Sequence, residues 1–312
     1  MSTRVLITTD YLRPGDETDR FLRSAGLETT HLPMTGRRDP GRLAAALAGV
    51  DAALVANEPL TEDVLARAPR LRAIVRTGVG HDSIDVAAAA RLGITVSTLP
   101  GVNANAVAEY TLGLLLAGAR RLVQSATGVA RGDWPREAGR ELRGSTLGLI
   151  GYGASARAVV PLARAFGMTV LCATNVPAES REPGVRFTGL PELLSTSDFV
   201  SVHTALTERT RGLLDAVAFK RMKPTALLVN TARGPIVDED ALVAAVRDGR
   251  SRAPRSTSWP RSRCRPAAPC AGWTGSSSVP TWPGRPPKHG GPRACAVPKK
   301  SWPRSRDGRG SW

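Results

Sequence analysis

The amino-acid sequence predicts an α/β protein with two parallel-sheet domains, Rossmann-like or flavodoxin-like, which face one another across a cleft and are followed by a disordered tail. Short apolar runs alternate with helical segments over about the first 250 of the 312 residues, and this alternation favours parallel sheets. A glycine-rich turn between an apolar strand and a helix opens a second series of such units. After Arg250 the composition changes abruptly and aliphatic residues become scarce.

The first domain is expected over residues 1–99 and is assigned to substrate binding below. Apolar runs predict its strands, and the segments between them predict helices. The expected strands are Arg4–Thr9, Ala52–Ala56, Ala73–Thr77 and Thr95–Thr98. The expected helices are Asp16–Ser24, Pro40–Leu47, Thr61–Ala68 and Val86–Leu92.

The second domain is expected over residues 100–250. Asn103–Arg120 predicts a long helix of small and aliphatic residues, and Thr146–Ile150 predicts an apolar strand that runs into the glycine turn. A helix, Ser155–Phe166, follows the turn. The remaining expected elements are Val170–Ala173, Leu190–Leu194, Phe199–His203, Leu213–Arg221, Ala226–Asn230 and Glu239–Asp248.

The turn after Thr146–Ile150 fits the Gly-x-Gly-x-x-Gly/Ala pattern of dinucleotide-binding domains. Its first glycine allows a tight turn, its second lets the backbone approach a pyrophosphate, and Ala156 permits close packing of helix and strand. The start of the following helix offers unpaired N–H groups to the phosphates. The cofactor-binding residues expected here are Gly151, Tyr152, Gly153, Ala154 and Ser155.

The next strand ends at Ala173-Thr174-Asn175 without an acidic residue. An acid at this point normally binds the ribose of NAD and would repel the 2′-phosphate of NADP. Because no acid stands here, the cofactor is expected to be either NAD or NADP, and Thr174 is included among its contacts.

Four motifs carry a resemblance to a known family: Gly78–Asp85, Pro100–Glu109, Met222–Pro224 and Asn230–Glu239. Their order and spacing over roughly residues 45–250 resemble those of the D-isomer-specific 2-hydroxyacid dehydrogenases, which include phosphoglycerate dehydrogenases and glyoxylate/hydroxypyruvate reductases. The resemblance implies hydride transfer between NAD(P)H and a small 2-oxo or 2-hydroxy acid. It also implies a homodimer that associates through the long helix after the hinge.

The resemblance also implies roles for individual residues. Arg233 would be the catalytic cation that contacts the substrate carboxylate and carbonyl. The substrate would further meet Gly78, Val79, Gly80 and Asn103, and the cofactor would meet His203, Thr231 and Ala232. Plainer interpretations remain open for several of them: a surface arginine, a simple glycine turn, a helix cap for Asn103 and a structural histidine at 203. No role is assigned to His81, and no metal site is expected.

The family's general acid/base histidine is missing. It is expected about 50 residues after the arginine, in a Pro-His-x-Ala-Gly context. His289 lies near that distance, but its neighbours do not match. A histidine is suited to this role because its pKa lies near neutrality. The alternative function is therefore a catalytically dead NAD(P)-binding remnant.

Residues 251–312 form a basic tail rich in Pro, Arg, Ser and Trp, with no Leu, Ile, Phe or Met. Such a segment cannot bury enough apolar surface to offset its ordering entropy, so we expect disorder. We hypothesise that a frameshift produced it. With GC-rich codons, reading one base earlier at Arg255 gives Ala-Leu-Asp-Val-Val, which resembles the family's next strand. The same shift at Pro280 gives Pro-His-Leu-Ala-Gly and restores the missing motif.

The net charge of +16 suggests a nucleic-acid partner, but the tail alone contributes +12. The remainder is close to neutral, so no nucleic acid is expected, and a basic-tailed nucleic-acid binder is kept only as a third alternative. The chain opens on an apolar strand and not on a charged segment followed by a long apolar one, which predicts no signal peptide and a cytoplasmic location. Ala104–Gly118 is too short to cross a bilayer and contains Glu109, so no membrane partner is expected.

Overall fold

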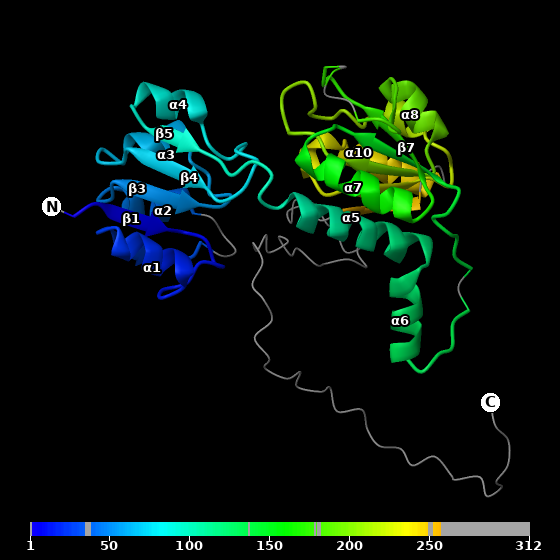
Figure 1. Cartoon of the computed structure of the whole chain (residues 1–312), viewed down its shortest axis with the longest axis horizontal. Coiled ribbons are helices and arrows are strands. Elements are labelled where there is room, and N and C mark those ends of the chain that lie inside the picture. Colours follow the sequence, from blue (N-terminus) through cyan, green and yellow to red (C-terminus); the bar gives the residue numbers. More distant parts are fainter. Residues whose placement is uncertain are drawn as a thin grey trace, which may run out of the picture.

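The computed structural model describes residues 2–34, 39–136, 138–177, 179 and 182–248, and the backbone of 252–256. Two parallel β-sheets form two α/β domains, one at the N-terminal side and one at the C-terminal side of α5 (Ala104–Ala119) (Figure 1). The predicted fold class is thus confirmed for these residues. No helix in the described part of the chain combines the length and apolar character needed to cross a membrane.

The first domain has a five-stranded sheet in the order β2-β1-β3-β4-β5. Such an order is typical of flavodoxin-like sheets. Its strands are β1 (Arg4–Ile7), β2 (Glu28–His31), β3 (Ala52–Val55), β4 (Ala73–Arg76) and β5 (Thr95–Ser97). Its helices are α1 (Glu17–Ser24), α2 (Pro40–Leu47), α3 (Glu62–Ala66) and α4 (Val86–Arg91).

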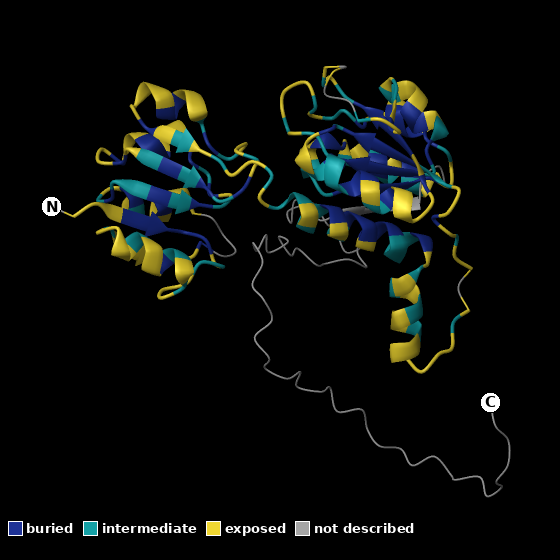
Figure 2. Cartoon of the chain, viewed as in Figure 1, coloured by how far each residue is buried: buried dark blue, intermediate teal, exposed yellow. Residues whose placement is uncertain are grey.

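The second domain has a six-stranded sheet in the order β11-β10-β9-β6-β7-β8, which is the arrangement of a dinucleotide-binding fold. Its strands are β6 (Thr146–Ile150), β7 (Thr169–Ala173), β8 (Arg186–Phe187), β9 (Phe199–Val202), β10 (Leu227–Asn230) and β11 (Arg252–Ser256). Its helices are α7 (Ala154–Ala165), α8 (Leu190–Thr196), α9 (Ala216–Arg221) and α10 (Glu239–Arg247). Every residue of β9 and β10 is buried, because helices cover both faces of the sheet (Figure 2).

Aspartate side chains fix the starts of five helices. In each case the carboxylate accepts a hydrogen bond from the backbone N–H three residues later, which satisfies a donor that the helix itself leaves unpaired. These N-cap residues are Asp16, Asp39, Asp85, Asp215 and Asp238. The helix starts inferred from the sequence therefore lie within a few residues of the observed ones.

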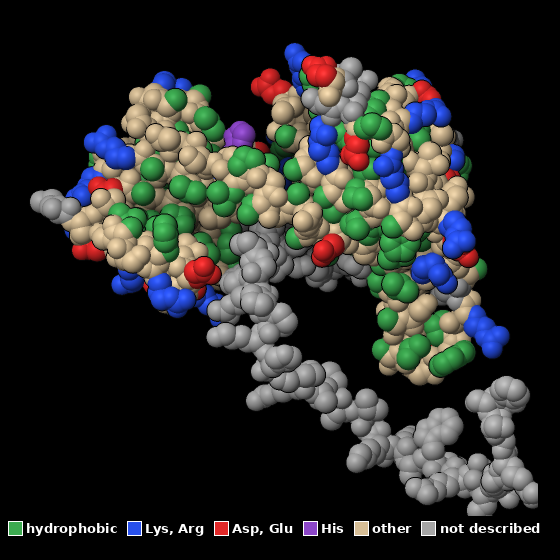
Figure 3. Space-filling model, viewed as in Figure 1, with side chains coloured by type: hydrophobic (Ala, Val, Ile, Leu, Met, Phe, Trp, Pro, Cys, Tyr) green, Lys and Arg blue, Asp and Glu red, His purple; other side chains and the backbone are tan. Residues whose placement is uncertain are grey.

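Two further elements of the second half were not expected from the sequence. Helix α6 (Leu122–Ala130) follows α5 directly and projects from the domain, with none of its residues buried. Hydrophobic side chains gather over this projection (Figure 3). Strand β8 is only two residues long, which is too short to leave a periodic signal in the sequence.

The prediction that the second domain ends at residue 250, with disorder over 251–312, is wrong at Arg252–Ser256. These residues form β11, which pairs in parallel with β10. A strand at a sheet edge is held by backbone hydrogen bonds, so it can form without apolar side chains. Residues 257–312 lie outside the described part of the chain, and for them disorder stays a prediction.

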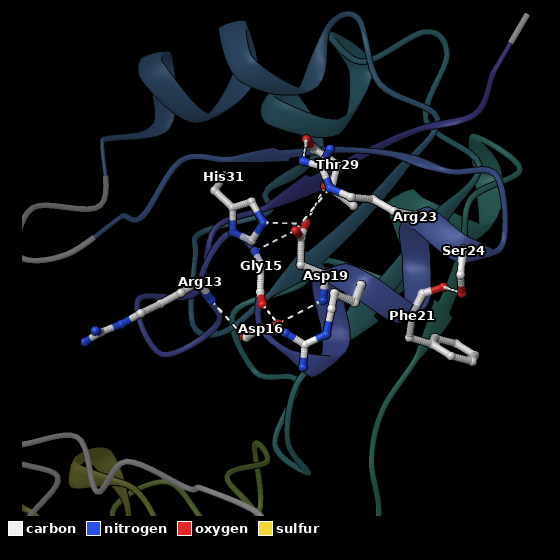
Figure 4. A network of polar contacts seen from close by, with 10 residues as sticks. Arg13, Gly15, Asp16, Asp19, Phe21, Arg23, Ser24, Thr29 and His31 are labelled. Carbon is white, nitrogen blue, oxygen red and sulfur yellow. Dashed lines mark hydrogen bonds and ion pairs between the residues drawn. The ribbon is translucent and has the colours of Figure 1, made fainter. Parts of the chain in front are cut away.

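Strand β2 was missed because its residues, Glu-Thr-Thr-His, are polar. A buried carboxylate explains why they nevertheless form a strand. Asp19 of α1 accepts hydrogen bonds from the hydroxyl of Thr29 and from Gly15 N at 2.7 Å, and it contacts His31 Nε2 at 3.0 Å (Figure 4). Arg23 Nε donates to the same carboxylate at 3.1 Å. The hydrogen bonds from Thr29 and His31 hold the pKa of Asp19 well below its usual range.

Candidate active site

Two guanidinium groups flank the glycine loop that follows β4. A Cβ built on Gly78 would lie 1.5 Å from Nη1 of Arg76, and one built on Gly80 would lie 2.1 Å from Nη2 of Arg233. Any larger residue at either position would displace an arginine head group. Glycine at both positions therefore lets the head groups of Arg76 and Arg233 lie against this loop.

Arg233 follows β10 and reaches across to the first domain. Its Nε donates to Oδ1 of Asp82 at 2.8 Å, and its Nη1 donates to the carbonyl of Ala232 at 3.0 Å. The buried side chain of Asn230 fixes this turn, because its Nδ2 donates to the Arg233 carbonyl and its Oδ1 accepts from Ala232 N. The guanidinium, which is 30% exposed, thus lies beside the Gly78–Gly80 loop.

Arg76 was missed by the sequence reasoning. It is the last residue of β4, only 9% exposed, and its Nη2 donates to Oδ1 of Asn57 at 2.7 Å. Its Nε has no hydrogen-bond partner among the described residues. Burial, and next the charge of Arg233, lower the pKa of Arg76. An arginine that ends an apolar strand immediately before a glycine loop was the signal that could have identified it.

Val79 belongs to the glycine loop, and Asn103 is half-buried at the start of α5. Val79 is 47% exposed. Asn103 precedes the first residue of α5, but its side chain makes no capping hydrogen bond, so the helix-cap interpretation is not supported. Nearby, a Cβ on Gly101 would lie 3.6 Å from Cβ of Ala154, which places the segment before α5 next to the start of α7.

The glycine turn after β6 has the geometry that a dinucleotide phosphate requires. Gly151 has a φ of +95°, and a Cβ there would lie 2.7 Å from the carbonyl oxygen of His203, so only glycine fits. A Cβ on Gly153 would meet nothing within 4 Å. No side chain caps α7, which leaves its first N–H groups for an anion. The turn therefore fits the phosphates of a nicotinamide dinucleotide.

The side chain of Tyr152 does not contribute to the open face of this turn. It is 2% exposed, its hydroxyl donates to Oε2 of Glu182 at 2.9 Å, and its ring packs edge-on against Phe187. Arg157 lies over the ring, 4.4 Å from its centroid. Burial, followed by Glu182, raises the pKa of Tyr152 to about 12. Among the groups of Tyr152, only the backbone is placed at the turn.

His203 lies directly after β9, and its ring is held between two hydroxyl groups. Ser155 Oγ is 3.2 Å from Nδ1, and Ser201 Oγ is 2.9 Å from Nε2. Burial lowers the pKa of His203 to about 4, so the ring is neutral near pH 7. The sequence suggested a wall of the cofactor site, and the structure places the ring against the first turn of α7.

The other expected cofactor residues lie at the same edge of the sheet, at the carboxyl ends of their strands. Thr174 follows β7, and its hydroxyl accepts from Val176 N at 3.1 Å. Thr231 follows β10 and lies 3.5 Å from the hydroxyl of Thr111 in α5. Ala232 is half-buried against the core of the second domain. In open parallel sheets, ligands bind at this edge.

Comparison with known proteins gives three findings. A glyoxylate reductase of Aeropyrum pernix is 43% identical over 198 residues, which are 60% of this chain and 59% of that protein. An (S)-sulfolactate dehydrogenase of Chromohalobacter salexigens is 44% identical over 216 residues, 67% of this chain and 70% of that protein. A solved structure from Thermus thermophilus has a TM-score of 0.76 at 37% identity and covers 86% of this chain and 85% of its own.

The chain spans about 60% of the length of the curated glyoxylate reductases that it matches. Residues 112–254 match a family model described as the NAD binding domain of D-isomer specific 2-hydroxyacid dehydrogenases. That match includes the glycine turn, the end of β9 and Arg233. The chain therefore belongs to the D-isomer specific 2-hydroxyacid dehydrogenase family.

Proposed function

We propose that this protein is built to transfer a hydride between NAD(P)H and a small 2-oxo or 2-hydroxy acid of the glyoxylate, hydroxypyruvate or phosphoglycerate type. The observation that carries the proposal is the position of the Arg233 guanidinium, which faces the Gly78–Gly80 loop of the other domain. The open glycine turn at Gly151–Gly153, which belongs to the same domain as Arg233, also supports the proposal. When bound, the nicotinamide ring supplies or accepts the hydride.

In this proposal Arg233 binds the substrate carboxylate and polarises the carbonyl. Because Asp82 occupies Nε and the Ala232 carbonyl occupies one donor of Nη1, the Nη1–Nη2 edge is the one that remains for a bidentate contact. Backbone N–H groups of the Gly78–Gly80 loop bind the same carboxylate, and Asn103 contributes from the segment between the domains.

Neither buried histidine side chain of the described residues is suited to donate the proton. The ring of His203 contacts two serine hydroxyls and titrates with a pKa near 4, far from neutrality. The ring of His31 contacts Asp19, which belongs to the first domain's own framework. His81 is exposed, and we assign it no role.

We further propose that residues after about 254 are the enzyme's own C-terminal region read in a shifted frame. Two observations support this. The match to the family model ends at residue 254, and the shifted frame yields a Pro-His-Leu-Ala-Gly segment at the expected distance from Arg233. In this view the chain as written binds the dinucleotide but turns over little or no substrate, which is the remnant function.

One experiment tests both proposals. The coding DNA is sequenced across residues 245–260, and NADH and NADPH oxidation is measured for the chain as written and for a frame-restored chain, with glyoxylate and hydroxypyruvate. We expect turnover from the restored chain and nearly none from the chain as written. Equal turnover from both would contradict the frame proposal, and no turnover with any small 2-oxo acid from the restored chain would contradict the enzymatic one.

We also propose a homodimer that associates through α5 and α6. The apolar side chains of Leu122 and Val129 on α6 are 51% and 56% exposed, and Trp134 beyond it is 82% exposed. Large exposed apolar side chains gathered on one projecting helix favour an association surface. Light scattering coupled to size-exclusion chromatography should give a dimer mass, and Val129→Glu should shift it to the monomer. A monomeric unmodified chain at micromolar concentration would overturn this proposal.

A further inference from the structure

His203 links the end of β9 to both parts of the phosphate-binding turn. Its carbonyl oxygen lies where a Cβ on Gly151 would clash, at 2.7 Å, so its backbone packs against the start of the turn. Its ring contacts Ser155, the second residue of α7, so its side chain packs against the start of the helix. One residue thus supports the two segments between which a pyrophosphate would bind.

The ring is neutral, so one of its nitrogens carries a proton and donates a hydrogen bond, and the other accepts a hydrogen bond. The directions of its two hydrogen bonds are therefore coupled. If Nε2 carries the proton, it donates to Ser201 and the hydroxyl of Ser155 must donate to Nδ1. If Nδ1 carries the proton, it donates to Ser155, and the hydroxyl of Ser201 donates to Nε2.

Ser201 decides between these two arrangements. It is fully buried within β9, and among the described residues its hydroxyl has one partner, Nε2 of His203. A buried hydroxyl that leaves its proton unpaired costs about 1–3 kcal/mol. The hydroxyl of Ser201 therefore donates to Nε2, which places the ring proton on Nδ1. With Nδ1–H donating to its oxygen, the hydroxyl of Ser155 keeps its own proton for another acceptor.

We propose that Ser201, His203 and Ser155 form a hydrogen-bond relay that prepares the Ser155 hydroxyl as a donor to a phosphate oxygen of the nicotinamide dinucleotide. His203 is a positioning residue in this relay, and Ser155 is the group that touches the cofactor. The inference rests on the proposed dinucleotide function. No net charge moves, because each hydroxyl and the imidazole keep one proton throughout.

The tautomer of His203 can be read directly in the full chain as it exists. Long-range proton–nitrogen NMR of histidine-labelled protein distinguishes Nδ1–H from Nε2–H, and with four histidines in the chain the His203 signals are assigned by their loss in His203→Asn. We expect the Nδ1–H tautomer with and without NADPH. In Ser201→Ala that tautomer should persist, and the nitrogen shift of Nε2 should change, because this nitrogen loses the hydroxyl that donates to it. An Nε2–H tautomer in the unmodified chain would overturn the relay.

Cofactor binding provides the second readout, measured by the fluorescence of NADH and NADPH on titration. Ser155→Ala should weaken binding about tenfold, because a hydrogen bond to a charged oxygen is lost. His203→Asn should retain more affinity than His203→Val, because the Asn amide N–H can take the place of Nδ1–H. Ser195→Ala is the matched control, since that hydroxyl bonds only within α8, and it should bind as the unmodified chain does.

The outcomes separate this inference from the proposed function. If the unmodified chain binds neither NADH nor NADPH, the dinucleotide function itself fails. If the unmodified chain binds a cofactor and Ser155→Ala binds it equally well, the function stands and the relay is wrong.

Discussion

Replacing Gly80 with alanine tests whether the position of the Arg233 guanidinium controls activity. The new Cβ would lie 2.1 Å from Nη2 and 2.9 Å from Cζ of Arg233. To restore an ordinary contact of about 3.5 Å, the guanidinium must move by roughly 1.4 Å. Gly80 does not have a positive φ, so the backbone accepts alanine without strain.

This displacement should lower catalytic activity but change the stability of the protein very little. A shift of this size in a group that orients substrate lowers kcat/KM about 100-fold, equivalent to about 2.7 kcal/mol of transition-state stabilisation. The end of a flexible side chain can move without disturbing the core, so the free energy of unfolding should change by only about 0.5 kcal/mol.

The assay is the initial rate of NADPH or NADH oxidation in the frame-restored enzyme, together with urea denaturation of the same samples. Gly49→Ala is the matched control in the same domain, because a Cβ there would meet only Nη1 of Arg4, at an ordinary 3.8 Å. An unchanged kcat/KM in Gly80→Ala would refute the reasoning. So would a loss of activity that tracks an equal loss of stability.

Three further predictions follow from individual contacts. Asp82→Asn keeps the size of the side chain but removes the charge that holds Nε of Arg233 at 2.8 Å. The KM for the oxo acid should therefore rise about tenfold, with the melting temperature nearly unchanged. An unchanged KM would show that Asp82 does not orient Arg233. Asp19→Ala should destabilise the first domain by about 2 kcal/mol at pH 7, because it leaves the buried His31 ring and the half-buried Thr29 hydroxyl without this partner. The pKa of Asp19 is held below its usual range. The stability that Asp19 contributes is therefore present above the unfolded pKa of about 3.9 and is lost as the pH falls below it. Urea denaturation at neutral and acid pH should show that the free energy of unfolding depends less on pH in the variant, and an equal dependence would contradict this. Thr174→Asp places a carboxylate at the end of β7, so the ratio of NADPH to NADH affinity should fall at least tenfold, whereas an unchanged ratio would mean that the ribose lies elsewhere.

The elements that could be predicted from the sequence are those whose apolar runs or capping residues lie within the element itself or directly beside it. The helix start after Asp39, the strand at Thr146 and the turn at Gly151 could all be predicted because their causes lie within a few residues of each other. Strand β2 could not, because it depends on Asp19 of a neighbouring helix accepting hydrogen bonds from Thr29 and His31. Its stabilising partner is distant in sequence and polar.

The candidate site shows the same division. Arg233 and the glycine positions were identifiable from motifs, but the direction of a side chain was not. Tyr152 lies in the cofactor turn by sequence, yet its ring is buried against Phe187. Arg76 is an ordinary strand residue by sequence, although its head group lies against the Gly78–Gly80 loop. Contacts between residues that are separated in the sequence, Tyr152 with Phe187 and Arg76 with Asn57, decide these cases, and no periodicity in the sequence records them.

A crystal structure of the chain with NADH and oxamate, a small unreactive analogue of a 2-oxo acid, tests the central claim most directly. We expect the pyrophosphate at the Gly151–Gly153 turn and the oxamate carboxylate between the Nη1–Nη2 edge of Arg233 and the backbone of the Gly78–Gly80 loop. Oxamate bound away from Arg233, or a dinucleotide bound away from that turn, would contradict it.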